Sequence, residues 1–289
     1  MRGVPEMKAF LMALGALLGL FSPCRGQVWF GYDRAAGVLT ESAAAETANG
    51  GLAMLLDRRG GQIAHLAAGG PWKTVFTAAN TSETAEAVYE LVFRSSNGEK
   101  MNLTLSDGVS QQSGNTFTLR LPPSGSLKLE TVSSSPEVQV GWANFYPRPG
   151  PEGDGILFAT FRATIPGKPD YEALVPLDFV AGSALVPFDN RNGFGTAVAV
   201  ANVFRDYPLA LEVEIRDSQG KRLQVYREHL PGYNHMAFQT AERWPATAGR
   251  EGVIVLNRVS VNGGMAALGL LFNPSGSVTS VPVATPVTW

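Results

Sequence analysis

Short runs of β-forming residues, separated by turn-forming residues, follow one another along the chain from about residue 51. Residues 87–94 are rich in Val, Tyr, Leu and Phe, and residues 116–121 alternate strictly between polar and apolar side chains. Alternation with a period of two is typical of strands that bury one face. The Asn-Gly pair that ends residues 95–98 accepts positive φ and indicates a hairpin turn. The segments predicted as strands in this half of the chain are residues 74–80, 87–94, 101–105, 116–121, 126–131, 138–145 and 155–162.

The second half of the chain repeats this pattern. Residues 72–80, Trp-Lys-Thr-Val-Phe-Thr-Ala-Ala-Asn, are echoed 122 positions later by Phe-Gly-Thr-Ala-Val-Ala-Val-Ala-Asn. At the same offset, Arg-Ser-Ser-Asn-Gly at residues 94–98 is echoed by Arg-Asp-Ser-Gln-Gly. The offset falls to 109 beyond residues 106–115, a polar segment of the first copy that we interpret as an inserted loop. The strands predicted in the second copy are residues 185–188, 196–202, 209–216, 222–227, 235–240, 252–258 and 264–272.

The repeat predicts two domains built in the same way. Many short strands separated by turns are typical of an all-β sandwich. We therefore expect two tandem β-sandwich domains, at residues 51–165 and 171–289. The join at residues 163–170 contains Pro and Gly and suits a short, stiff linker. A single, intimate double sandwich is the alternative.

The first residues carry the pattern of an export signal. Arg2 and Lys8 precede an apolar run of 13 residues, 9–21, and small and turn-forming residues follow. This run is too short to span a bilayer comfortably, and no later segment reaches the length needed. We predict a signal peptide at residues 1–26 and a lead-in or linker at residues 27–50.

Composition and charge narrow the class of partner. Only 17% of the residues are charged and 45% are hydrophobic, which favours a turn-rich, extracellular type of protein with a packed core. Without residues 1–26 the chain retains 20 basic and 24 acidic residues and has no basic stripe, so nucleic acid is not an expected partner. Cys24 is the only cysteine. Its loss with the signal peptide would exclude disulfides and thiol chemistry, while its lipidation is disfavoured because Pro23 precedes it.

The histidines and acidic residues form no motif that predicts a metal or a cofactor. His65, His229 and His235 do not follow the His-x-x-x-His spacing of zinc sites. A metal shared by His229, His235 and Glu228 is a minor alternative, and residues 189–193 match a calcium loop only in part. No Gly-x-Ser-x-Gly elbow is present, although a serine triad assembled in space stays open. We therefore expect no cofactor and assign no catalytic residue.

Candidate ligand-binding residues lie near the end of the first copy. Trp142 is interpreted as a buried inter-sheet residue, with a sugar-stacking platform as the alternative. Tyr146, Glu152 and Asp154 lie in or next to a Gly- and Pro-rich loop, and loops carry function on rigid sandwiches. A pair of carboxylates also suits glycoside hydrolysis, although solvated charge is the simpler interpretation.

Asn80 and Asn202 occupy the same place in the two copies, at the end of a predicted strand. An Asn side chain in this position bonds nearby backbone groups and tolerates left-handed geometry. We interpret both residues as structural, with ligand binding as the minor alternative.

Three motifs of the first copy resemble a known kind of module. They are Gly-Gly-Pro-Trp-Lys-Thr at residues 69–74, Leu-Pro-Pro-Ser-Gly-Ser at 121–126 and Val-Gly-Trp-Ala at 140–143. Together they resemble a module of uncharacterised secreted proteins from environmental bacteria, over about residues 51–283. The second copy departs from the pattern, with Phe194 in place of the Trp and no Gly-Trp-Ala. The resemblance implies paired immunoglobulin-like β-sandwiches and no catalytic residues.

These patterns predict an exported, non-catalytic protein that is secreted or held at the cell surface or in the periplasm. The expected role is a surface, matrix or adhesion-type binding or structural module, with an extracellular glycan or a surface protein as partner. The alternative is a secreted carbohydrate-binding, carbohydrate-active or hydrolytic protein. A structural subunit that pairs through sheet edges is a third possibility, and the oligomeric state stays open.

Overall fold

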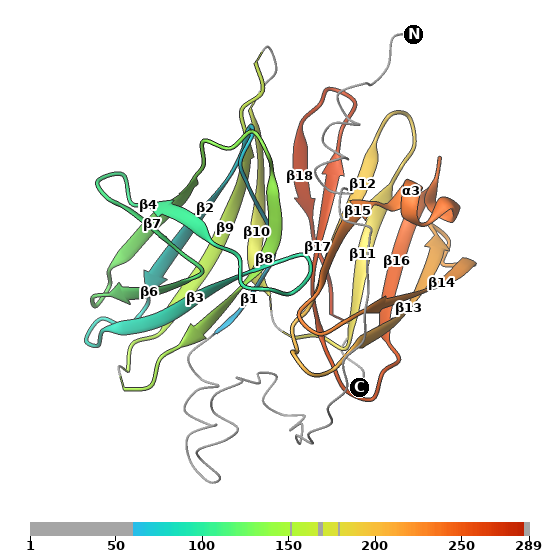
Figure 1. The fold of residues 1–289 in the computed structure, drawn as a ribbon. Coiled ribbons are helices and arrows are strands. Elements are labelled where there is room, and N and C mark those ends of the chain that lie inside the picture. The colour runs from blue at the N-terminus through green and yellow to red at the C-terminus, as the bar shows by residue number, and fades with distance from the viewer. Residues whose placement is uncertain (1–59, 151, 167–169, 179, 286–289) are drawn as a thin grey trace.

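The computed structural model describes residues 60–150, 152–166, 170–178 and 180–285 (Figure 1). Strands dominate these residues, so the predicted all-β class is confirmed. The described helices are a single α-helical turn, α3 (Thr240–Arg243), and a 3-10 turn, η1 (Pro245–Thr247). In the described part of the chain, no helix has the length and apolar character needed to cross a membrane. The predicted signal peptide, the lead-in and Cys24 lie outside the described residues.

The first ten strands form one hydrogen-bonded sheet that folds into two layers. Its strand order is β5-β4-β7-β2-β9-β10-β1-β8-β3-β6. The strands are β1 (Gly61–Ala68), β2 (Trp72–Asn80), β3 (Ala87–Ser95), β4 (Leu103–Ser106), β5 (Gln111–Gly114), β6 (Thr116–Leu121), β7 (Ser126–Val132), β8 (Gln139–Pro147), β9 (Gly155–Ala163) and β10 (Tyr171–Asp178). We call this unit the first sandwich.

Aromatic side chains fill the space between the layers of the first sandwich. Tyr89 and Phe145 stack with ring centroids 4.0 Å apart. Phe76 of one layer meets Phe93 of the other at 5.4 Å. All four are buried because every second residue of a strand points to the same face. Large, rigid rings at these positions supply much of the buried apolar area.

The next eight strands form two four-stranded sheets, which we call the second sandwich. The sheet orders are β11-β16-β13-β14 and β15-β12-β17-β18. A cluster of buried apolar residues from both sheets forms the core, and fully buried Trp244 lies within it. The strands are β11 (Ser183–Asp189), β12 (Gly195–Asn202), β13 (Leu209–Asp217), β14 (Arg222–Leu230), β15 (His235–Gln239), β16 (Glu251–Arg258), β17 (Met265–Phe272) and β18 (Val278–Val281).

Strand pairing follows the same scheme in both sandwiches. β2 lies between β7 and β9, and β12 lies between β15 and β17. The registers also correspond, since Ala79 pairs with Ser126 and Ala201 pairs with His235. Gly155 lies opposite Asn80, and Met265 lies opposite Asn202. The last pairing shifts the expected alignment by one residue, because it is Met265 and not Gly264 that matches Gly155.

β10 crosses the domain boundary expected from the sequence. It pairs with β9 through residues 171–176 and then with β1 through Leu177 and Asp178, so it joins the two layers of the first sandwich. The expected boundary places residues 171–178 in the second domain and outside any predicted strand. Pro and Gly mark turns inside a sandwich as well as linkers between sandwiches, and here they connect two adjacent antiparallel strands.

The segment at 106–115, predicted as a loop, contains strand β5. β5 pairs with β4 to form a hairpin, and the hydroxyls of Thr104 and Ser113 lie 2.8 Å apart across it. β5 forms an outer edge of its sheet and its side chains are mostly exposed. An exposed edge strand buries no apolar face, so its sequence carries no hydrophobic alternation.

The two sandwiches lie side by side (Figure 1), and one buried apolar cluster contains residues of both. Along β12, Val198 and Val200 belong to the core of the second sandwich, whereas the alternating alanines Ala197, Ala199 and Ala201 pack with the first. Small side chains let the sheets approach closely, and burial of both faces accounts for the nearly continuous apolar run of β12. The two sandwiches are therefore in close contact along β12.

Candidate functional site

A polar contact between the two sandwiches stands out within their apolar interface. The turn after β3 (residues 95–98) meets the connection between β14 and β15 (residues 231–235). The N–H of His235 donates to the carbonyl of Ser96 over 3.0 Å. Gly98 adopts a φ of +85°, and a Cβ on it would lie 3.0 Å from Tyr233. We call the contact formed by His65, residues 94–98, Trp142 and residues 232–235 the seam.

Trp142 is part of the seam. The indole is fully buried, and its Nε1–H donates to the carbonyl of Tyr233 over 2.9 Å. Tyr233 is held at a φ of +60°, a left-handed conformation that is uncommon for a large side chain. The buried interpretation of Trp142 is therefore correct, and no ring face is left for a sugar.

Arg94 brings a positive charge to the seam. Its guanidinium carbon lies 3.4 Å from the centre of the Tyr233 ring, and its Nη1 donates to the carbonyl of Gly98 over 3.2 Å. Arg94 is only 6% exposed. A cation over an aromatic face is stabilised most where water is excluded, so Arg94 fixes the turn against the second sandwich.

Two buried histidines face each other across the seam. Nδ1 of His65 lies 3.2 Å from Nε2 of His235, and Nδ1 of His235 lies 3.2 Å from Oγ of Ser96. Burial lowers the pKa of His65 to about 4. Burial also lowers the pKa of His235 well below its usual value, and the neighbouring His65 adds to this effect. Both rings are therefore neutral at pH 7.

The Ser96–His235–His65 chain has the connectivity of a serine triad but a different third member. A neutral imidazole stands where a triad has a carboxylate, so the charge that stabilises an imidazolium is missing. The structure also separates the histidines that were considered as a metal site. Glu228 accepts from Arg243 and Trp244, while His235 faces His65. Among the described residues, no three His, Cys, Asp or Glu side chains are grouped as metal ligands.

The other candidate ligand residues lie apart from the seam. Tyr146 is half-buried on β8, opposite Glu90. Glu152 is exposed and Asp154 is half-buried in the loop between β8 and β9. Backbone hydrogen bonds hold the end of this segment: the N–H of Thr81 donates to the carbonyl of Asp154 over 2.7 Å, and the N–H of Gly153 donates to the carbonyl of Glu86 over 2.9 Å. Glu152 and Asp154 thus add two carboxyl groups to the surface next to the start of β9.

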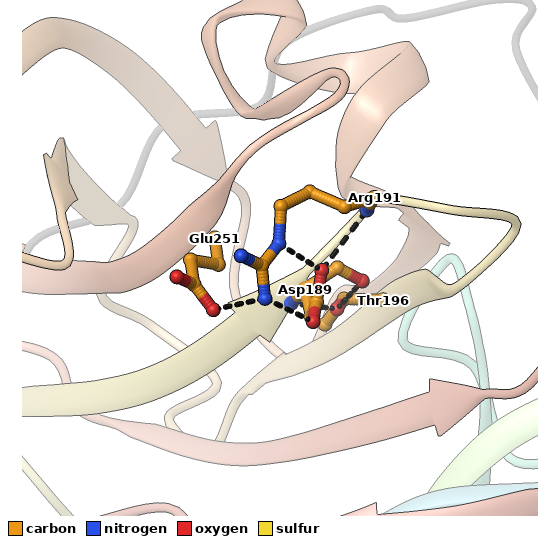
Figure 2. Close-up of polar contacts among 4 residues, drawn as sticks. All are labelled: Asp189, Arg191, Thr196 and Glu251. Carbon is orange, nitrogen blue, oxygen red and sulfur yellow. Dashed lines mark hydrogen bonds and ion pairs between the residues drawn. The ribbon is translucent and has the colours of Figure 1, made fainter.

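An ion-pair cluster marks the end of β11 (Figure 2). Asp189 and Glu251 lie directly opposite each other on β11 and β16, and the guanidinium of Arg191 contacts both carboxylates. Nε of Arg191 donates to Asp189 over 3.0 Å. This hydrogen bond lowers the pKa of Asp189. In the segment that resembled a calcium loop, the Asp189 carboxylate is therefore bound to a fixed cation of the chain.

Buried polar side chains at equivalent positions tie each sandwich together. Nδ2 of Asn80 donates to the carbonyls of Ala85, Leu121 and Pro122 over 2.7, 3.0 and 3.1 Å. Nδ2 of Asn202 donates to the carbonyls at the matching positions, over 2.7, 3.2 and 3.1 Å. The predicted structural role of both asparagines is confirmed.

A threonine pair repeats in the same way. Oγ1 of Thr74 donates to the carbonyl of Ala67 over 2.9 Å, and Oγ1 of Thr196 donates to the carbonyl of Asp189 over 3.0 Å. Each hydroxyl also accepts a hydrogen bond from the N–H of the same partner residue. The sequence repeat contained both threonines, but their partners lie on other strands and could not be read from it.

Comparison with known proteins adds little to this picture. No protein-family model matches the chain, and no curated protein matches it. Among solved structures, the chain is similar to vicilin from Corylus avellana (hazelnut), with 10% sequence identity, a TM-score of 0.23 and coverage of 75% of this chain and 76% of that chain. A likeness this weak carries no argument about fold or function.

Proposed function

We propose that the protein is an exported, non-catalytic tandem of two immunoglobulin-like β-sandwich domains. It acts as a binding or structural module at a cell surface or in an extracellular matrix. Its partner is an extracellular glycan or a surface protein.

The proposal rests on side-chain hydrogen bonds that recur at equivalent positions in the two halves. Asn80 and Asn202, and likewise Thr74 and Thr196, make matching hydrogen bonds to backbone groups in the two halves. The two halves thus share the hydrogen bonds that hold neighbouring strands together. A pair of units that share only structural residues suits a scaffold whose specificity lies in surface loops.

The loop between β8 and β9 is the proposed contact surface. It belongs to the half with the fuller motif pattern, backbone hydrogen bonds of Gly153 and Asp154 tie it to neighbouring segments, and it carries Glu152 and Asp154, while Tyr146 lies on the preceding strand β8. Carboxylates and a phenol hydroxyl are groups that hydrogen-bond to a glycan or to a polar protein surface. Trp142 has no place in this surface because it is buried.

Binding and turnover assays test the proposal together. Purified protein is screened against an array of bacterial and host glycans and against extracellular matrix proteins, and in parallel against chromogenic esters and glycosides. We expect binding without turnover, weakened at least tenfold by the double change Glu152→Gln and Asp154→Asn. The matched control is Glu242→Gln, an exposed carboxylate of the second half, which should leave binding unchanged.

Turnover abolished by the loop double variant would replace the proposal with the hydrolytic alternative. If neither the loop double variant nor the Glu242→Gln control changes binding, the contact surface lies elsewhere and the role of the loop is refuted. A protein that binds no glycan or matrix protein and assembles with concentration would favour a structural subunit instead.

A further inference from the structure

The two histidines of the seam come from different sandwiches. His65 lies on β1 and His235 on β15, 170 positions apart, and they are 1% and 6% exposed. Their rings lie nearly parallel, with centroids 5.2 Å apart and an interplanar angle of 23°. Phe161 meets the His65 ring edge-on at 5.5 Å. The pair thus lies in an apolar setting, with the Ser96 hydroxyl as its outer contact.

No described carboxylate contacts either imidazole ring. In the seam itself the nearby cation is Arg94, which packs on Tyr233, two positions before His235. The acidic groups on the neighbouring elements have other partners or lie in solvent. The charged side chains on the elements packed around the pair are Lys73 with Glu130, Arg162 with Glu172, Asp178 on the N–H of Ala267, Arg205 near Tyr233 and exposed Glu99.

We infer that the His65–His235 contact is an acid-sensitive latch between the two sandwiches. The closed latch needs a lone pair on one imidazole to accept the N–H of the other. Protonation of both rings removes that lone pair and sets two cations with their ring nitrogens 3.2 Å apart. The turn at 95–98 then moves away from residues 232–235, and the hydrogen bond from Trp142 to Tyr233 breaks. Each sandwich keeps its own strands.

The direction of the pH response follows from burial. Burial lowers the pKa of His65 from 6.5 to about 4 in the closed state, so the open state binds the proton more strongly. The latch is closed above about pH 6.5 and weakens as the pH falls toward 4. Between pH 7 and pH 4 the His65 shift alone raises the ratio of open to closed molecules roughly 120-fold.

Nuclear magnetic resonance on the full chain tests the latch. Signals of the three histidine rings and of the Trp142 indole N–H are followed from pH 7.5 to 3.5, with circular dichroism recorded on the same samples. We expect the Trp142 signal to change with the same midpoint as the titration of His65, well below pH 6.5. The circular dichroism of the β-sheets should be retained. Small-angle scattering should report an increased radius of gyration over the same pH interval.

Variants separate the latch from general acid effects. The double change His65→Gln and His235→Gln keeps a neutral hydrogen-bonding pair and should remove the acid response of Trp142. His229→Gln alters the third histidine, which is exposed on β14, and should leave the response intact. A folded double-Gln variant that still opens in acid would overturn the latch. So would wild-type histidines that titrate below pH 6 while the Trp142 signal stays constant, a result that needs no variant.

Discussion

Replacement of Asn202 by alanine should destabilise the protein more than any surface change, because it removes a buried hub. The side chain is fully buried and bonds three carbonyls, and its Oδ1 accepts from the N–H of Phe204 over 3.2 Å. An amide has only two N–H groups, so the hub amounts to about three full hydrogen bonds. At about 1 kcal/mol for each net bond, the expected loss is about 3 kcal/mol.

Urea unfolding followed by circular dichroism measures this loss. We expect the midpoint to fall with an unchanged m-value, and Asn80→Ala should cost nearly the same because its partners match. Asn202→Asp keeps the shape but turns a donor toward the carbonyls into an acceptor, so its cost should exceed that of alanine. Exposed Asn102→Ala is the control and should change stability by less than about 0.5 kcal/mol. A cost below about 1 kcal/mol for Asn202→Ala would refute the hub argument.

Three further outcomes follow from the structure. Trp142→Phe removes the N–H that donates to the Tyr233 carbonyl and should cost about 2 kcal/mol in urea unfolding. Trp244→Phe, inside one sandwich, serves as the comparison. An unchanged unfolding midpoint for Trp142→Phe would contradict the hydrogen bond. Ala199→Leu adds three carbons to an alanine that is 4% exposed between the sandwiches and should cost about 1–3 kcal/mol, measured by thermal unfolding; a neutral result would mean that the sheets do not meet there. Arg191→Met breaks solvent-exposed ion pairs and should lower stability by less than about 1 kcal/mol; a larger loss in the same assay would show that the cluster is more than a surface feature.

The pattern of polar and apolar residues along the chain predicted most strands well. It predicted contacts between segments far apart in the sequence poorly. Residues 87–94 form β3, as their β-forming side chains predicted, residues 116–121 form β6, as their alternation predicted, and the turn at 95–98 forms as well. β5 was missed because an exposed edge leaves no apolar signal, and β10 because its Pro- and Gly-containing approach resembles a linker.

The candidate site could be predicted only in part. The repeat itself pointed to Asn80 and Asn202, since a residue kept at the end of a strand in both copies has a local structural reason to be there. The seam offered no such signal. His65 lies in an apolar strand and His235 beside a turn, and only the packing of one sandwich on the other brings them together. Trp142 was expected to be buried, but its partner Tyr233 lies in the other half of the chain.

The alanine-lined face of β12 has a consequence for how such a chain can be divided. Cutting the chain between β10 and β11 would leave Ala197, Ala199, Ala201 and their neighbours on β17 as a flat apolar surface in water. Surfaces of this kind promote association, so an isolated second half should pair with itself or aggregate. Each half therefore shields an apolar face of the other from water. Neither half should be transferred to another protein as an independent domain.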